Sequence, residues 1–157
     1  MKKRPNLVRA FIAVVACLLL VAGTAVSGGV TDKSVKHHRV VFQLNENDEA
    51  AMRHAISNSV NLSNAYREKN EPIDIEIVAY GAGINMFRMD TSPVREALQF
   101  LHVNNPNIAF IVCGNTKAIM EKKEGHPIMF IDGVRVVPFG IVRIVELQEA
   151  GWSYIRP

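Results

Sequence analysis

The chain has 157 residues, of which 48% are hydrophobic and 21% charged, and its formal net charge at pH 7 is +3. This length suits a single domain with one hydrophobic core. Four of the 18 basic residues lie in the first nine positions, and without them 14 basic residues stand against 15 acidic ones. The rest of the chain therefore lacks the basic excess of a nucleic-acid-binding surface, and no nucleic-acid partner is expected.

Residues 1–27 are predicted to be a signal peptide. A basic start precedes the apolar stretch from Ala10 to Val21, and Ala25-Val26-Ser27 has the small-x-small pattern of a cleavage site. Two alternatives stay open: the apolar stretch is close to the minimum length of an uncleaved membrane anchor, and the residues up to Cys17 resemble a lipoprotein signal. We expect cleavage and a periplasmic protein, with membrane attachment only if the segment is retained. Export would leave Cys113 as the single cysteine, without a partner for an intramolecular disulfide.

Residues 28–38 are expected to be an exposed lead-in, and residues 39–157 to form one α/β domain. Hydrophobic periodicity predicts these elements in chain order: a strand at 39–44, a long helix capped by Asp48, a strand at 73–79, a short helical segment at 84–88, a helix with Pro93 in its first position, a strand at 108–112, a helix after Cys113, a strand at 134–137, a helix from Pro138-Phe139-Gly140 to Gly151, and a short strand within 152–157. Strands that alternate with helices imply crossover connections, and hence a mostly parallel sheet with helices on both faces.

Two arrangements fit residues 121–133. Residues 128–131 could pair with residues 134–137 as a hairpin through Asp132-Gly133. We favour the other arrangement, in which only residues 134–137 join the main sheet.

Ligands of open parallel sheets bind beyond the carboxyl ends of the strands. The predicted ends are Asn45, Gly81-Ala82-Gly83, Cys113-Gly114-Asn115 and Pro138-Phe139-Gly140. Glycine in three of these segments permits tight turns and close approach of the backbone. A functional site is therefore expected along this edge of the sheet.

Cys113 is the main candidate for chemistry at that edge. It closes the apolar run 108–112 and precedes a predicted helix. A thiol at a helix N-terminus faces unpaired backbone N–H groups and the positive end of the helix dipole, and both favour the nucleophilic thiolate. The alternative is a buried, inert cysteine that fills the junction between strand and helix.

The other motifs carry weaker signals. Gly81-x-Gly83 is only part of a dinucleotide-binding fingerprint and is better explained as a turn. The five histidines lack the spacing of a zinc site, so neither a metal nor another cofactor is predicted. His54 or His102 could act as a base beside Cys113, and Lys117 could assist its thiolate, although ordinary helix-surface positions are favoured for all three.

Six segments of the domain together resemble the sequence pattern of a known family. They are Val40–Gln43, Ala55–Asn58 with Asn61-Leu62, Ile77–Ile84, Val112–Thr116, Val136–Gly140 and Leu147–Pro157. Their combination resembles the DsrE/DsrF-like sulfur relay family, in its exported single-domain branch. The resemblance covers nearly all of residues 39–157.

The resemblance implies a three-layer fold with a five-stranded, mostly parallel sheet, and assembly into homotrimers or homohexamers. It also implies that the cysteine after the third strand, here Cys113, holds a persulfide and passes sulfur to a partner. The positions that would shape the surroundings of this cysteine are Gly81, Gly83, Gly114, Asn115 and Gly140.

These features lead to the hypothesis of a periplasmic sulfur-handling protein, a sulfurtransferase-like carrier if it is active. Cys113 would accept sulfane sulfur from donor proteins or small thiols and release it to an acceptor thiol. Two other functions stay open. The chain could be a non-catalytic, oligomeric module for small-ligand binding or assembly in which Cys113 is merely packed, or a redox sensor that oxidises reversibly at Cys113.

Overall fold

The computed structural model describes residues 35–157. The predicted signal peptide and the first part of the predicted lead-in lie outside the described residues. None of the helices in this described part is long and apolar enough to cross a membrane.

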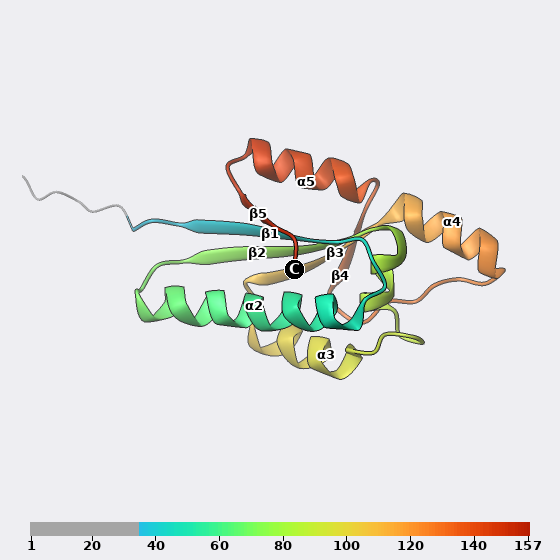
Figure 1. Cartoon of the computed structure of the whole chain (residues 1–157), viewed down its shortest axis with the longest axis horizontal. Helices are drawn as coiled ribbons and strands as arrows, with labels where there is room; N and C mark the ends of the chain where they lie inside the picture. Colours follow the sequence, from blue (N-terminus) through green and yellow to red (C-terminus); the bar gives the residue numbers. More distant parts are fainter. Residues whose placement is uncertain (1–34) are drawn as a thin grey trace, which may run out of the picture. The chain divides into compact units, whose positions relative to one another are not determined.

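Strands and helices alternate along the described chain, as the sequence predicts (Figure 1). In order they are β1 (His38–Leu44), α2 (Glu49–Glu68), β2 (Ile73–Ala79), the 3-10 helix η1 (Gly81–Phe87), α3 (Arg95–Asn104), β3 (Ile108–Cys113), α4 (Gly114–Glu124), β4 (Val134–Val137), α5 (Gly140–Glu149) and β5 (Ser153–Ile155). The predicted cap of the first long helix is confirmed, since the Asp48 carboxylate accepts hydrogen bonds from the N–H groups of Ala50 and Ala51.

The strands form one five-stranded sheet in the order β4-β3-β2-β1-β5, and every neighbouring pair is parallel. The expectation of a mostly parallel sheet is therefore confirmed and extended to all of its pairs. The last residues of neighbouring strands are in register: Leu44 pairs with Ala79, Ala79 with Val112, and Cys113 with Val137. The carboxyl ends of β1 to β4 consequently form one continuous rim.

Helices cover both faces of the sheet, which gives the three-layer α/β fold (Figure 1). The core under α2 and α3 contains most of the buried apolar side chains, among them Phe42, Ile77 and Phe110. A smaller apolar cluster lies under α5 and consists of Val41, Val78, Ile111, Ile144 and Leu147. Strand residues alternate between these two cores, as expected for a sheet that is buried on both faces.

The beginning of α3 differs from the prediction. Pro93 is not the first helical residue, because Val94 is the N-cap and the helix begins at Arg95. Val94 is 2% exposed, and its backbone N–H is bonded to the Ser92 hydroxyl at 3.3 Å. Pro93 therefore belongs to the turn before α3, and this turn places the Val94 side chain in the core. The preceding helical segment also starts earlier than predicted, at Gly81.

Residues 125–133 form a connection and not a strand of the sheet, and β4 alone continues the sheet after α4. The favoured arrangement of this region is thus confirmed and the hairpin is not formed. The connection runs instead beside residues 87–89: Phe130 makes an isolated antiparallel bridge with Arg88, and the N–H of Met89 donates to the carbonyl of Met129 at 2.9 Å.

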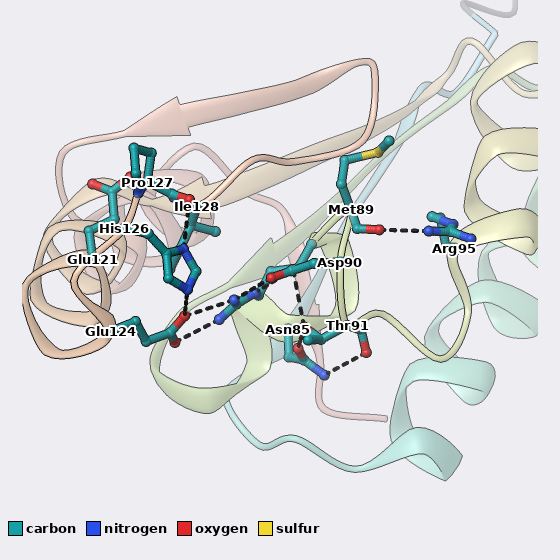
Figure 2. A network of polar contacts seen from close by, with 11 residues as sticks. Asn85, Met89, Asp90, Thr91, Arg95, Glu121, Glu124, His126, Pro127 and Ile128 are labelled. Atoms are coloured by element: carbon teal, nitrogen blue, oxygen red, sulfur yellow. Dashed lines mark hydrogen bonds and ion pairs between the residues drawn. The ribbon is translucent and has the colours of Figure 1, made fainter.

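Arg88 fastens this connection to the fold. Its guanidinium, on a side chain only 8% exposed, donates two hydrogen bonds to the Asp90 carboxylate and two to the Glu124 carboxylate, at 2.7 to 2.9 Å. The two carboxylates approach this guanidinium from the loop after η1 and from the last turn of α4 (Figure 2). We call these three residues the Arg88 clamp.

Candidate functional site

Cys113 lies where β3 becomes α4. It is the last strand residue and the N-cap of the helix, with an extended backbone (φ −72°, ψ 113°), and it is 5% exposed. The chain can turn there because Gly114 is small: a side chain at this position would approach the Val137 carbonyl oxygen to 3.1 Å. The predicted placement of the thiol at a helix N-terminus is confirmed.

The pKa of the Cys113 thiol is set by neighbouring groups of α4 and α5. The neutral thiol makes no capping bond to α4, and its contact is with the Pro138 carbonyl oxygen, 3.9 Å away. The thiolate is a better acceptor. Burial raises the pKa of the Cys113 thiol, but hydrogen bonds from the Thr116 hydroxyl and from the backbone N–H groups of Gly140, Thr116 and Asn115 outweigh burial and lower this pKa below its ordinary value.

The Thr116 hydroxyl is held in place from the neighbouring strand end. Its oxygen accepts a hydrogen bond from the Gly81 N–H at 3.1 Å, which leaves the hydroxyl proton for the Cys113 sulfur. Gly81 has φ +52°, a left-handed conformation that glycine adopts without strain. Gly81 thus acts on the thiol through Thr116.

Gly140 contacts the site directly as the first residue of α5. A side chain there would lie 3.1 Å from the Cys113 Cβ and 3.2 Å from the Tyr80 Cβ. The missing side chain brings the Gly140 N–H close to the sulfur. Asn115 contributes its backbone N–H, which also bonds to the Pro138 carbonyl oxygen at 3.1 Å, while its side chain is exposed.

Gly83 has a different neighbourhood from the other predicted glycines. A Cβ on Gly83 would lie 2.3 Å from the Leu44 carbonyl oxygen and 2.9 Å from the Asn45 nitrogen. Its closest approach is therefore to the end of β1. Four of the predicted residues therefore lie near Cys113: Gly81, Gly114, Asn115 and Gly140. Gly83 does not, and it allows η1 to pack closely on β1.

The basic side chains considered as helpers of Cys113 have other contacts. Lys117 forms an ion pair with Glu121 at 2.5 Å, and His54 is exposed on α2. The ring of His102 lies 6.0 Å from that of Phe110 and adjoins Gly133. Within residues 35–157, no group of His, Cys, Asp and Glu residues could hold a metal ion.

Thr116 is the functional residue that sequence reasoning missed. It stands three positions after the N-cap cysteine, the spacing at which a helix residue turns back toward its cap. That spacing was the available signal. The contribution of the Gly140 N–H depends on a contact between residues distant in sequence and had no local signal.

The fold and the site define an α/β protein with an all-parallel five-stranded sheet and an acidified thiol at its carboxyl rim. No family model matches the chain, and no curated protein does. A similar solved structure is that of MTH1491, a protein of unknown function from Methanobacterium thermoautotrophicum. The two chains are 34% identical over 76% of this chain and 99% of MTH1491, with a TM-score of 0.61. The chain therefore belongs to the same family as MTH1491.

Proposed function

We propose that this protein is a sulfur carrier in which Cys113 accepts a sulfane sulfur as a persulfide and passes it on. The observation that supports this function best is the set of hydrogen-bond donors around one sulfur, which lowers the pKa of the thiol. The resemblance of the domain to DsrE/DsrF-like proteins adds support. From the predicted signal peptide at residues 1–27 we also propose a periplasmic location, and from the resemblance we propose assembly into homotrimers or homohexamers.

The reaction consists of two exchanges at sulfur. The Cys113 thiolate attacks the outer sulfur of a donor persulfide, forms the new S–S bond, and expels the donor thiolate. An acceptor thiolate then attacks the outer sulfur on Cys113, which regenerates the Cys113 thiolate. Each exchange moves one neutral sulfur atom, together with its proton where it carries one, so no external oxidant or reductant is needed.

The donors around Cys113 suit both steps. They stabilise the thiolate that attacks in the first step and that leaves in the second, and a good leaving thiolate has a low pKa. Neutral donors are sufficient for this purpose, since hydrogen bonds to charged acceptors are about twice as strong as those between neutral groups.

Intact mass spectrometry tests the proposal. The protein is incubated with a sulfane-sulfur donor beside the Cys113→Ser variant, which keeps the size of the side chain. The expected result is a gain of one sulfur atom that reductant removes and that the variant lacks. Unchanged mass in the native protein, together with a thiol that resists alkylation until the protein is denatured, would overturn the proposal.

One observation favours a second function. Cys113 is only 5% exposed, as expected for a cysteine that is simply packed in a binding or assembly module. The two functions differ in the rate of alkylation of the native protein near neutral pH. Rapid labelling supports the carrier, whereas protection until unfolding supports the module.

A further inference from the structure

The outer face of α5 is apolar. Three of its residues, Ile141, Val142 and Val145, point away from the sheet and are 52%, 48% and 47% exposed. Phe139, just before the helix, is 53% exposed. We call these four residues the α5 face. The other side of the helix packs on the sheet in the smaller apolar cluster, on the side of the sheet that faces away from α2 and α3 (Figure 1). α5 is therefore apolar on two opposite sides, which is typical of a helix that is buried on both.

The residue types of the α5 face suit packing and not exposure to water. Isoleucine and valine are stiff β-branched residues and weaker helix formers than lysine, glutamate or glutamine. On a helix surface that stays in water they cost helix stability without return, whereas burial against another molecule stabilises them. Phe139 and Val142 also line one groove of about 300 Å³, which is open to an apolar side chain from outside. These features indicate a docking surface.

The charges along α5 indicate what docks there. Its second half contains Glu146 and Glu149, both exposed, and its last turn has no basic residue. The helix dipole disfavours acidic residues at this end. The first turn has no acidic residue and no side-chain cap, and only its Gly140 N–H is directed at Cys113. Each end of α5 thus has a charge that the opposite end of a second α5 helix would complement.

We propose that the α5 face is a contact between two copies of this chain, related by a two-fold axis, with their α5 helices antiparallel. In this arrangement the acidic end of each helix lies beside the positive end of the other, and the apolar residues meet between them. The inference does not rest on the carrier function and deepens the proposed assembly. Because a two-fold contact joins copies in pairs, it fits a homohexamer and does not fit an isolated homotrimer.

The particle mass, measured by light scattering, tests this contact. Val145→Glu places a charge on the outer side of α5, and glutamate is compatible with a helix. We expect this variant to have about half the mass of the native particle and an unchanged circular dichroism spectrum. Phe100→Glu on α3, where Phe100 is 71% exposed, is the matched control and should keep the native mass. A native protein that is a monomer or a homotrimer, or an unchanged mass in Val145→Glu, would overturn the inference.

A disulfide across the axis tests the symmetry of the contact. Val145→Cys combined with Cys113→Ser leaves residue 145 as the single cysteine of residues 35–157. Because Val145 lies in the middle of α5, it faces its own counterpart when two such helices pack antiparallel. Mild oxidation should therefore produce a disulfide-linked dimer. Ile119→Cys in the same background is the matched control on α4, where Ile119 is 60% exposed, and should give no dimer. Absence of a dimer in Val145→Cys would overturn the two-fold arrangement.

Glu149→Lys tests the antiparallel direction. The substitution places a positive charge beside the positive end of the partner helix, and the symmetry of the contact repeats this change twice. The dissociation constant of the pair should therefore rise about ten-fold. Unchanged or tighter association would show that the helices are not antiparallel. Sulfur loading of Cys113 is a separate measurement, so failure of the α5 contact leaves the carrier function intact, and failure of sulfur loading leaves the α5 contact intact.

Discussion

Replacing Thr116 by Val tests whether side-chain hydrogen bonding controls the reactivity of Cys113. The substitution keeps a β-branched side chain of nearly the same volume and removes the hydroxyl. That hydroxyl accepts a hydrogen bond from the Gly81 N–H at 3.1 Å and stabilises the Cys113 thiolate. The variant therefore loses one donor to the sulfur and leaves the Gly81 N–H without its acceptor.

The size of the effect on the thiol follows from one hydrogen bond. A hydrogen bond to a charged group contributes about 1.5–3 kcal/mol. Because about 1.4 kcal/mol is a factor of ten in an equilibrium constant, loss of this bond should raise the pKa of Cys113 and reduce its ionisation constant about ten-fold or more. At a pH below the native pKa, the thiolate fraction, and with it the alkylation rate, should fall by the same factor. Loss of the Gly81 acceptor should also lower the free energy of unfolding by about 1 kcal/mol.

The assay is the rate of alkylation as a function of pH, whose midpoint gives the pKa of the thiol. Thr116→Ser is the matched control, since it restores the hydroxyl and should return the midpoint to that of the native protein. If the Thr116→Val profile coincides with the native one, the backbone N–H groups alone set the pKa, and the role assigned to the Thr116 hydroxyl is incorrect.

Further predictions concern the Arg88 clamp and Gly83. Arg88→Met should reduce the free energy of unfolding in urea by about 2 kcal/mol, because it leaves two carboxylates without their partner at a partly buried site; an unchanged midpoint would show that solvent replaces the clamp fully. The clamp lowers the pKa of Asp90 from 3.8 to about 2, so the free energy of unfolding should decrease as the pH drops from about 4 to about 2. Because the Asp90 side chain is 49% exposed, we expect a decrease of only about 1 kcal/mol. The free energy of unfolding should depend less on pH in Arg88→Met over this range, and an equal dependence in the two proteins would show that Arg88 does not set the pKa of Asp90. Gly83→Ala should destabilise by at least about 2 kcal/mol in thermal unfolding, because its Cβ would lie 2.3 Å from a backbone oxygen of Leu44; a native-like midpoint would contradict this packing.

The parts of the fold that the sequence predicts well are those with strong local patterns. The alternating residues of β2 give its bounds at Ile73 and Ala79 without error, and Asp48 marks the start of α2. The region of residues 125–133 has no such pattern, since its path depends on the Arg88 clamp and on backbone bonds to residues 87–89. Similarly, Pro93 precedes α3 because the burial of Val94 sets where the helix begins.

In the candidate site, too, features with a local sequence pattern could be predicted and contacts between distant segments could not. Cys113 can be assigned to a helix N-terminus from sequence, because an apolar run that ends in a glycine-containing turn is a local feature. The donors that acidify its thiol come partly from elsewhere: the Gly140 N–H belongs to α5, and the Gly81 N–H that orients Thr116 follows β2. Only the parallel register of the sheet brings these segments together.

Burial and hydrogen bonding have opposite effects on the pKa of the Cys113 thiol, and their combination bears on which of the two proposed functions is correct. Burial alone would raise the pKa of the thiol, which would suit an inert packing residue. Here hydrogen bonds more than offset burial at a position 5% exposed. An inert cysteine needs no such set of donors, whereas a sulfur carrier needs both features: donors to stabilise the thiolate, and limited exposure to protect a persulfide from unwanted thiols and oxidants. Gly140 adds a spatial requirement, since a Cβ at this position would lie 3.1 Å from the Cys113 Cβ and a larger residue would fill the space beside the sulfur. Gly140→Ala should therefore slow sulfur loading of Cys113 by a donor persulfide more than it slows alkylation of Cys113 by a small reagent. Equal slowing of both rates would show that the donor does not use the space beside Gly140.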